Sequence, residues 1–288
     1  MLLKERFPGM FLTKGFVLKS VFGGRPDLTQ RFLEITLGVT MEEVEILHRE
    51  HELHPVANRA AGYLDIYARD VEGNEYDIEA QIRNNHDEVL RARRYHALMD
   101  AERIKRGDAK KLKEVFHRSI VIFICDFDPF GEGLPVYDTL MHCVQTQRIV
   151  DDGRRATYLN TTADAEGDLG HLIRYITGEA DEDEWDDPLA RGIVEELEKA
   201  KNDPEWMETF MTHEEELRIA RESSFRDGKE EGREEGREEG REEGKEEAEL
   251  RFERLASALR EAGRGDELMP AMRDRGVRDA LMAEFHIA

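Results

Sequence analysis

Residues 62–82, GYLDIYARDVEGNEYDIEAQI, alternate apolar and polar side chains on both sides of a turn-forming sequence, EGN at 72–74. Alternation with a period of two sends successive side chains to opposite faces of a strand, so this stretch predicts a β-hairpin. A three-residue turn at 72–74 would pair position 65 with position 81. Asp65, Glu79 and Gln81 would then lie within one rung of each other on one face of the hairpin.

This cluster of carboxylates has two interpretations. The first is the solvated outer face of an antiparallel hairpin, which is a common arrangement. The second is a divalent-metal site, because like charges side by side repel unless a cation lies between them. Oxygen ligands from Asp65 and Glu79 suit Mg²⁺ or Mn²⁺, and such a site would serve metal-assisted hydrolysis of a phosphodiester.

The net charge of −23 is unevenly distributed along the 288 residues. Residues 1–180 carry 24 lysines and arginines against 30 acids, whereas residues 181–288 carry 18 against 35. The acidity therefore belongs mainly to the C-terminal part. It argues little against a nucleic-acid substrate for the N-terminal part.

Cysteines and apolar runs give no sign of an exported or membrane protein. Two cysteines make no disulfide framework, and Cys125 falls in an apolar strand pattern typical of a small buried residue. The N-terminal sequence MLLKERFPGMF has charges where a signal peptide needs an apolar core. The longest apolar run, 120–125, is far below the roughly 18 residues of a membrane span. We expect a cytoplasmic protein with no membrane association.

A helix and a basic segment are predicted directly after the hairpin. Residues 88–105 have helical spacing, with Arg91, Arg94 and Tyr95 on one face. The wider segment 83–118 holds eleven basic residues against six acids. Such a segment suits a phosphate backbone, although a charged surface helix that packs through its few apolar residues would show the same composition. The apolar run at 119–125 then predicts a central strand buried on both faces.

The C-terminal part is repetitive and predicts a helical, low-complexity tail. Glycines recur every fourth residue through 228–244, GKEEGREEGREEGREEG, and no apolar seam accompanies them. The repeat predicts either a marginal charged helix or an extended linker, and a homo-oligomer formed through this tail is a further expectation. We predict a nuclease-like domain at 1–220, a repeat segment at 221–248 and a small helical tail at 249–288.

Four motifs in order resemble one known family. They are FVLKSVFG at 16–23, LDIYARDVEGNEYDIEAQ in the hairpin, Arg91 with Tyr95 four residues later, and SIVIFICDFDPF from residue 119. Together they resemble the Rpn-type recombination-promoting nucleases, also described as PD-(D/E)XK nuclease family transposases. The resemblance extends over roughly residues 10–250. It implies an α/β, restriction-endonuclease-like core with a mixed sheet of about four strands flanked by helices.

The resemblance also implies DNA as the substrate and Mg²⁺ as the cofactor. Asp65 matches the metal-binding aspartate of the family motif, and Glu79 matches its second acid. Gln81 stands where the wider superfamily has lysine, and glutamine cannot supply that positive charge. One departure is Gly15, where the family usually has aspartate four residues before the lysine that corresponds to Lys19.

The resulting hypothesis gives each residue a role in DNA hydrolysis. Asp65 and Glu79 hold one or two Mg²⁺ or Mn²⁺ ions with help from Asp77 or a backbone carbonyl, and Gln81 positions the attacking water. The substrate-binding residues that neutralise or contact the DNA backbone are Arg91, Arg94, Tyr95 and Lys19.

Two alternatives remain from the sequence. In the first, the chain is a catalytically degenerate nuclease fold that acts as a DNA-binding or self-assembly module, which Gly15 and the acidic tail favour. In the second, the tail mimics nucleic acid and blocks the basic helix.

Overall fold

Strand β6 (Ser119–Cys125) is the centre of the fold, and every one of its residues is buried. Its run of β-branched and aromatic side chains suits a strand covered on both faces, which confirms the prediction for 119–125. The computed structural model describes residues 1–48, 51–53, 62–103 and 116–287. The other described strands are β1 (Val44–His48), β2 (His51–Leu53), β3 (Gly62–Leu64), β4 (Ile66–Asp70), β5 (Glu75–Gln81), β7 (Val136–Thr139), β8 (His142–Cys143), β9 (Arg148–Ile149) and β10 (Arg154–Asn160).

The main sheet has six strands in the order β1-β4-β5-β6-β10-β7. Strand β6 pairs in parallel with β5 on one side and with β10 on the other, while the outer pairs are antiparallel. The sheet is therefore mixed, as expected, although it has more than the four strands that the resemblance implied. Two small antiparallel ribbons, β2 with β3 and β8 with β9, stand apart from it.

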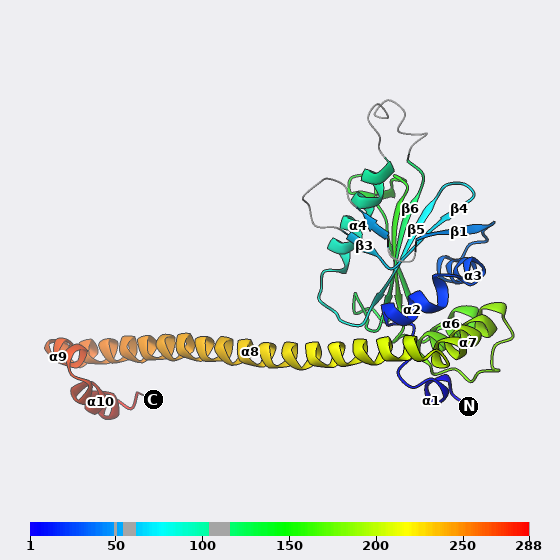
Figure 1. The fold of residues 1–288 in the computed structure, drawn as a ribbon. Helices are drawn as coiled ribbons and strands as arrows, with labels where there is room; N and C mark the ends of the chain where they lie inside the picture. The colour runs from blue at the N-terminus through cyan, green and yellow to red at the C-terminus, as the bar shows by residue number, and fades with distance from the viewer. Residues whose placement is uncertain (49–50, 54–61, 104–115, 288) are drawn as a thin grey trace. The chain divides into compact units, whose positions relative to one another are not determined.

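Helices cover both faces of this sheet (Figure 1). Strand β6 contributes apolar side chains to the cores on both faces. Alternate residues from Ile120 to Ile124 join the larger core with the helices that flank one face, whereas Val121 and Phe123 pack under α4 on the other face. The described helices are α1 (Leu3–Arg6), α2 (Gly15–Phe22), α3 (Pro26–Leu37), α4 (Glu88–Arg103), α6 (Gly167–Thr177), α7 (Pro188–Lys201), α8 (Pro204–Glu261), α9 (Leu268–Arg273) and α10 (Arg275–Glu284), with a 3₁₀ turn at Gly265–Glu267.

The hairpin of β4 and β5 exists, but its predicted register is wrong. Ile66 pairs with Ile78, and Tyr67 pairs with Asp77, so position 65 lies level with 79 rather than 81. The turn begins one residue earlier than expected, because the Asp70 carboxylate accepts hydrogen bonds from the backbone N–H groups of residues 72 and 74. This side-chain cap fixes the turn, and alternation along the strands cannot reveal it.

The solvated interpretation of the polar face of β5 is also wrong. Glu75, Asp77, Glu79 and Gln81 are each at most 9% exposed. They lie on the face of the sheet that α4 covers, on the same side as Phe123 of β6. Buried carboxylates require compensating partners, so this face is the first place to look for chemistry.

The chain divides into two compact units, Met1–Phe210 and Met211–Ala288. The first contains the six-stranded sheet. The second contains most of α8 together with α9 and α10, around a small core of Leu255, Leu259, Ala271 and Leu281. Helix α8 runs unbroken through the glycine repeat, so the helical alternative for 228–244 holds. The three-part division with boundaries at 220 and 248 stays a prediction.

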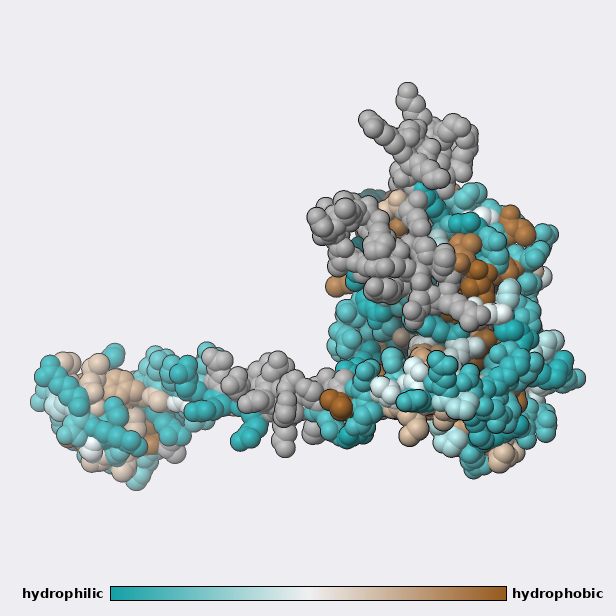
Figure 2. Space-filling model, in the orientation of Figure 1, coloured by the Kyte–Doolittle hydropathy of each residue, from teal (hydrophilic) through white to brown (hydrophobic). Residues whose placement is uncertain are grey.

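The view in Figure 2 shows a largely hydrophilic surface with separate apolar patches over the first unit. Within the described part of the chain, no helix combines the length and the apolar character that crossing a bilayer requires.

Candidate active site

Asp65 and Glu79 lie side by side across the hairpin. Asp65 sits between β3 and β4, and Glu79 points from β5 toward the face that α4 covers. The Asp65 backbone N–H donates to Glu79 Oε1 over 3.0 Å. In return, the Ala80 backbone N–H donates to Asp65 Oδ2 over 3.2 Å. These crossed hydrogen bonds fix the two carboxylates relative to the two strands.

Helix α2 places Lys19 and Gly15 next to the Asp65 carboxylate. Lys19 Nζ lies 3.0 Å from Asp65 Oδ1, and both side chains are about one-fifth to one-quarter exposed. Gly15, the first residue of α2, also abuts Asp65, because a Cβ built on Gly15 would lie 3.1 Å from Asp65 Oδ2. The position that departs from the family pattern is therefore part of this site.

Helix α4 contributes Arg91, whose guanidinium group connects three partners. Its Nη2 lies 3.1 Å from Glu79 Oε2 and donates to Tyr95 Oη over 2.8 Å, while Nη1 donates to Gln81 Oε1. Tyr95 Oη in turn donates to Glu79 Oε2 over 3.0 Å. The guanidinium carbon also lies 5.6 Å from the centroids of the Tyr95 and Phe123 rings. Arg91 and Tyr95 lie four residues apart on one helix face, and both therefore bind the Glu79 carboxylate.

Gln81 is held at both ends of its side-chain amide. Its oxygen accepts from Arg91, and its Nε2 donates to the Ala80 carbonyl over 2.8 Å. The positive charges beside the carboxylates come instead from Lys19 on α2 and Arg91 on α4.

Burial of the carboxylates gives the site an unusual electrostatic state. Burial, reinforced by the charge of Asp65, raises the pKa of Glu79 to about 8. Burial and the neighbouring charges of Glu79 and Asp65 likewise raise the pKa of Asp77 well above its ordinary value. No hydrogen-bond donor among the described residues lies in bonding geometry to either carboxylate oxygen of Asp77. Unpartnered buried oxygens mark a place where a cation or a proton is needed.

The carboxylate oxygens of this site are ligands of the type that a hard divalent cation prefers. Asp65, Glu79 and Asp77 present carboxylate oxygens from two adjacent strands, and oxygen ligands suit Mg²⁺ and Mn²⁺. The described residues nevertheless form no ready cage of three or more such ligands. Mg²⁺ commonly takes only one or two protein carboxylates and fills its remaining positions with water and substrate phosphate oxygens. The arrangement suits an ion that binds together with a phosphate.

The structure brings together most of the residues singled out from the sequence. Lys19, Asp65, Glu79, Gln81, Arg91 and Tyr95 are linked by direct contacts. Arg94 lies exposed on α4. Sequence reasoning missed Phe123, which packs under Arg91 and is the β6 partner of Glu79. The sequence signal that could have found it is its place in the apolar run 119–125, which predicts a strand of the same sheet.

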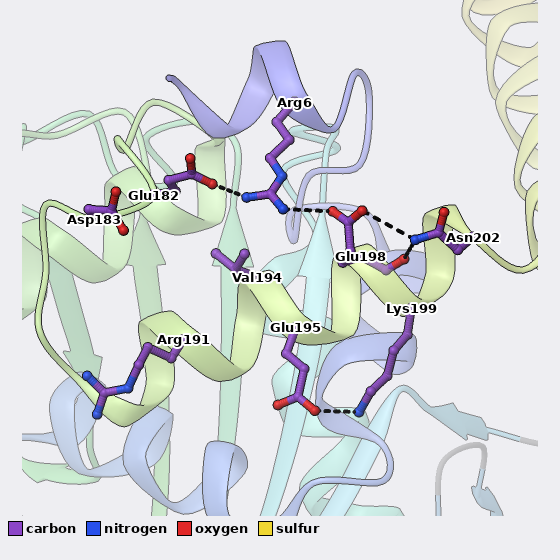
Figure 3. A pocket seen from close by; sticks show the side chains of 9 residues that line it. All are labelled: Arg6, Glu182, Asp183, Arg191, Val194, Glu195, Glu198, Lys199 and Asn202. Carbon is purple, nitrogen blue, oxygen red and sulfur yellow. Dashed lines mark hydrogen bonds and ion pairs between the residues drawn. The ribbon is translucent and has the colours of Figure 1, made fainter.

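A second concave region lies in the first unit, where α1 meets α7 (Figure 3). This pocket has a volume of about 640 Å³. Figure 3 shows Arg6 reaching between Glu182 and Glu198, and Lys199 pairs with Glu195 over 2.8 Å. Arg6 thus connects α1 with Glu182 and with Glu198 of α7, so the pocket lies where α1 packs on α7.

Comparison with known proteins supports the same part of the chain. The sequence model of the family described as PD-(D/E)XK nuclease family transposase matches residues 13–160, just over half of the chain and less than the 10–250 expected. The matched range includes every residue of the contact network around Asp65 and Glu79. No curated protein and no solved structure matches the chain. With a family model that matches just over half of its length and a mixed central sheet, the chain belongs to the PD-(D/E)XK nuclease family transposases.

Proposed function

We propose that this protein is an endonuclease that uses Mg²⁺ or Mn²⁺ to hydrolyse DNA phosphodiesters, in a process of recombination or transposition. Membership of a nuclease family supports the hydrolytic class. The observation that carries the proposal is the convergence of two carboxylates and two cations from three separate elements. Asp65 and Glu79 lie side by side on the hairpin, with Lys19 and Arg91 each within 3.1 Å of one of them.

Asp65 and Glu79 are the residues that would hold the metal ion, with Asp77 behind them. The bound ion would supply a water of lowered pKa and a Lewis acid for a phosphate oxygen. Lys19 provides, from α2, the positive charge that Gln81 lacks at the motif position, and it pairs with the partly exposed Asp65 carboxylate. A phosphate that approaches Asp65 therefore also meets the Lys19 ammonium group.

Arg91 has two functions in this proposal. Before substrate binds, it neutralises Glu79 and donates a hydrogen bond to Gln81, which fixes the orientation of both side chains. With Arg94 on the same helix it also offers positive charge to the DNA backbone. Tyr95 orients Glu79 through its hydroxyl group. Gln81 positions water or a phosphate oxygen by hydrogen bonds.

The second candidate is a non-catalytic DNA-binding or assembly module. Gly15 favours it, because this chain has no side-chain oxygen at a position that abuts Asp65. The intact set of Asp65, Glu79 and Lys19 favours the enzyme.

Nicking of supercoiled plasmid tests the two candidates directly. The purified full-length protein is incubated with Mg²⁺ or Mn²⁺, with EDTA, and as the variants Asp65→Asn and Glu79→Gln. We expect nicking that needs the metal and falls at least 100-fold in both variants, whereas Asp183→Asn, an exposed acid outside the site, retains activity. Absence of nicking, or nicking that survives Asp65→Asn, would reject the catalytic proposal.

Metal binding without catalysis is measured separately by thermal unfolding. An ion that binds only the native state raises the melting temperature by mass action. A metal-dependent rise that is lost in Asp65→Asn, in a protein that nicks no DNA, would support the non-catalytic module.

A further inference from the structure

Two acid-free stretches of the first unit flank one groove, in a chain that contains 65 acids and has further acid-free stretches, such as 6–26, elsewhere. Residues 89–99 of α4 hold three arginines and no aspartate or glutamate. Residues 139–150, between β7 and β10, hold Arg148 and no acid. A polyanion approaches a protein of net charge −23 most easily where local acids are few, so the absence of acids from these two stretches favours its approach there.

The second stretch folds into an exposed two-stranded ribbon, here called the β8–β9 ribbon (residues 139–150). His142 pairs with Ile149, Cys143 pairs with Arg148, and residues 144–147 make the turn. The apolar side chains of Val144 and Ile149 are 68% and 64% exposed. Leu140, Met141 and Val150 are exposed as well. Large apolar side chains gathered on one short exposed element indicate a contact surface.

The polar side chains of the same ribbon can form hydrogen bonds, and none of them carries a negative charge. His142, Gln145, Thr146 and Arg148 are exposed, and they lie between the apolar residues Met141, Val144 and Ile149 of the ribbon. This mixture differs from the continuous apolar face that a stable dimer usually needs. Arginine and glutamine with apolar contacts is the combination by which ribbons and arms bind DNA grooves.

The β8–β9 ribbon lies beside α4, on the flank opposite the candidate active site. Val89, Arg93 and His96 of α4 line a groove of about 350 Å³ with Leu140 and Met141 of the ribbon. An acid that lines this groove, Asp152, accepts a hydrogen bond from Arg154 Nε over 2.7 Å and is neutralised. The other flank of α4 presents Arg91 and Tyr95 to Glu79.

One helix therefore separates the ribbon from the catalytic carboxylates. A helix with its side chains is about 10–12 Å wide, and the DNA major groove of about 12 Å admits a two-stranded ribbon. A duplex that lies along the exposed side of α4 can contact the ribbon and the site together.

We propose that the β8–β9 ribbon and the exposed face of α4 form a DNA-binding track that holds the substrate beside the active site. The proposal rests on the DNA nuclease function proposed above. Arg93 and Arg148 contact phosphates, the polar side chains of the ribbon contact groove edges or sugar, and Val144 and Ile149 make apolar contacts in the groove. The ribbon positions DNA and takes no part in the chemistry.

The test compares two charge-matched double variants of the full-length protein. Gln145→Glu with Arg148→Glu changes the ribbon. Met272→Glu with Arg273→Glu makes the same change in net charge on α9, where both residues are exposed. Binding of a fluorescent DNA duplex is measured by anisotropy in EDTA at several salt concentrations, and folding is checked by circular dichroism and thermal unfolding.

We expect the ribbon variant to bind DNA at least tenfold more weakly than the wild type, with the salt slope reduced by about one. The α9 variant should remain within about twofold of the wild type. Val144→Ser in a separate variant should weaken binding without changing the salt slope, because it removes an apolar contact only.

Three results would overturn the inference, and each points to a different cause. Equal affinity of both double variants, in a protein that nicks plasmid, removes the track and leaves the nuclease function. Unchanged affinity with a wild-type dimer that the ribbon variant converts to a monomer, measured by light scattering, assigns the ribbon to self-association. A wild type that neither binds nor nicks DNA removes both proposals.

Discussion

Gly15 and Asp65 show how one missing side chain shapes the site. Gly15, the first residue of α2, lies against the Asp65 carboxylate. Even the methyl group of an alanine at position 15 would lie 3.1 Å from Asp65 Oδ2. An aspartate at position 15 would therefore place a second carboxylate next to the first. The departure from the family pattern removes a candidate oxygen ligand and reduces repulsion in the metal-free protein.

Gly15→Asp should make the protein more dependent on metal. Two carboxylates in contact should cost on the order of 1–4 kcal/mol in EDTA, and Mg²⁺ or Mn²⁺ should restore that loss by binding both. Thermal unfolding with and without metal checks this, with Gly15→Ala as the uncharged control of similar crowding. A metal-induced shift of the same size in wild type, alanine and aspartate variants would contradict it.

Glu79 predicts how stability changes with pH. Its pKa is about 8 in the native protein against an ordinary value of 4.5, so the native state binds more protons than the unfolded state between these values. Stability in EDTA should therefore fall as pH rises through this window, by up to about 1.4 kcal/mol per unit. Asp77, with its raised pKa, acts in the same direction.

Glu79→Gln should flatten this dependence, because glutamine does not titrate. Urea unfolding of wild type and variant at pH 5, 6.5 and 8 in EDTA measures the slope. Identical slopes in the two proteins would show that Glu79 does not titrate in this range.

At the scale of elements, helix α2 is held between the site and the start of α8. Trp206 Nε1 donates to Ser20 Oγ over 2.7 Å, and the Trp206 and Phe16 rings lie 5.0 Å apart. Ser20 is next to Lys19, which contacts Asp65. The first two turns of α8, although outside the family match, thus help to set the position of Lys19.

Trp206→Ala should weaken both folding and catalysis. Loss of the indole contacts should destabilise the first unit by about 2–4 kcal/mol, and α2 should hold Lys19 less firmly. Met211→Ala, a mostly exposed residue on the same helix, is the control and should change little. Chemical unfolding and plasmid nicking measure the two effects. Unfolding free energies that match for Trp206→Ala and Met211→Ala would count against the role of this contact.

Periodicity predicted most of the elements and much of the site. Alternation identified β4 and β5, a continuous apolar run identified β6, helical spacing identified α4, and motif order indicated the family. What alternation could not provide is the partner of each face. The register depended on the Asp70 cap, and the burial of Asp77 and Glu79 depended on α4 folding back over β5. Both are contacts between segments, which local patterns do not encode.

At the scale of the whole molecule, charge divides the two faces of the first unit. Residues 181–210 hold twelve acids and three basic residues, and α7 within them packs in the core on the face opposite α4. DNA should therefore be repelled from the α7 side and approach the α4 side, where the acid-free stretches 89–99 and 139–150 lie. Self-association through the repeat tail stays a prediction.

The parallel pairing of β6 with β5 and with β10 sets the order in which the site of this protein can assemble. Strand β5, which carries Glu79, needs β6 beside it, and β6 ends at residue 125. Helix α2, which carries Lys19, needs the start of α8 near residue 206. During synthesis, a ribosome must therefore release more than two-thirds of the chain before the carboxylates and Lys19 stand together. A nascent or prematurely ended chain lacks the assembled site, so the DNA cleavage proposed above would begin only with the finished first unit.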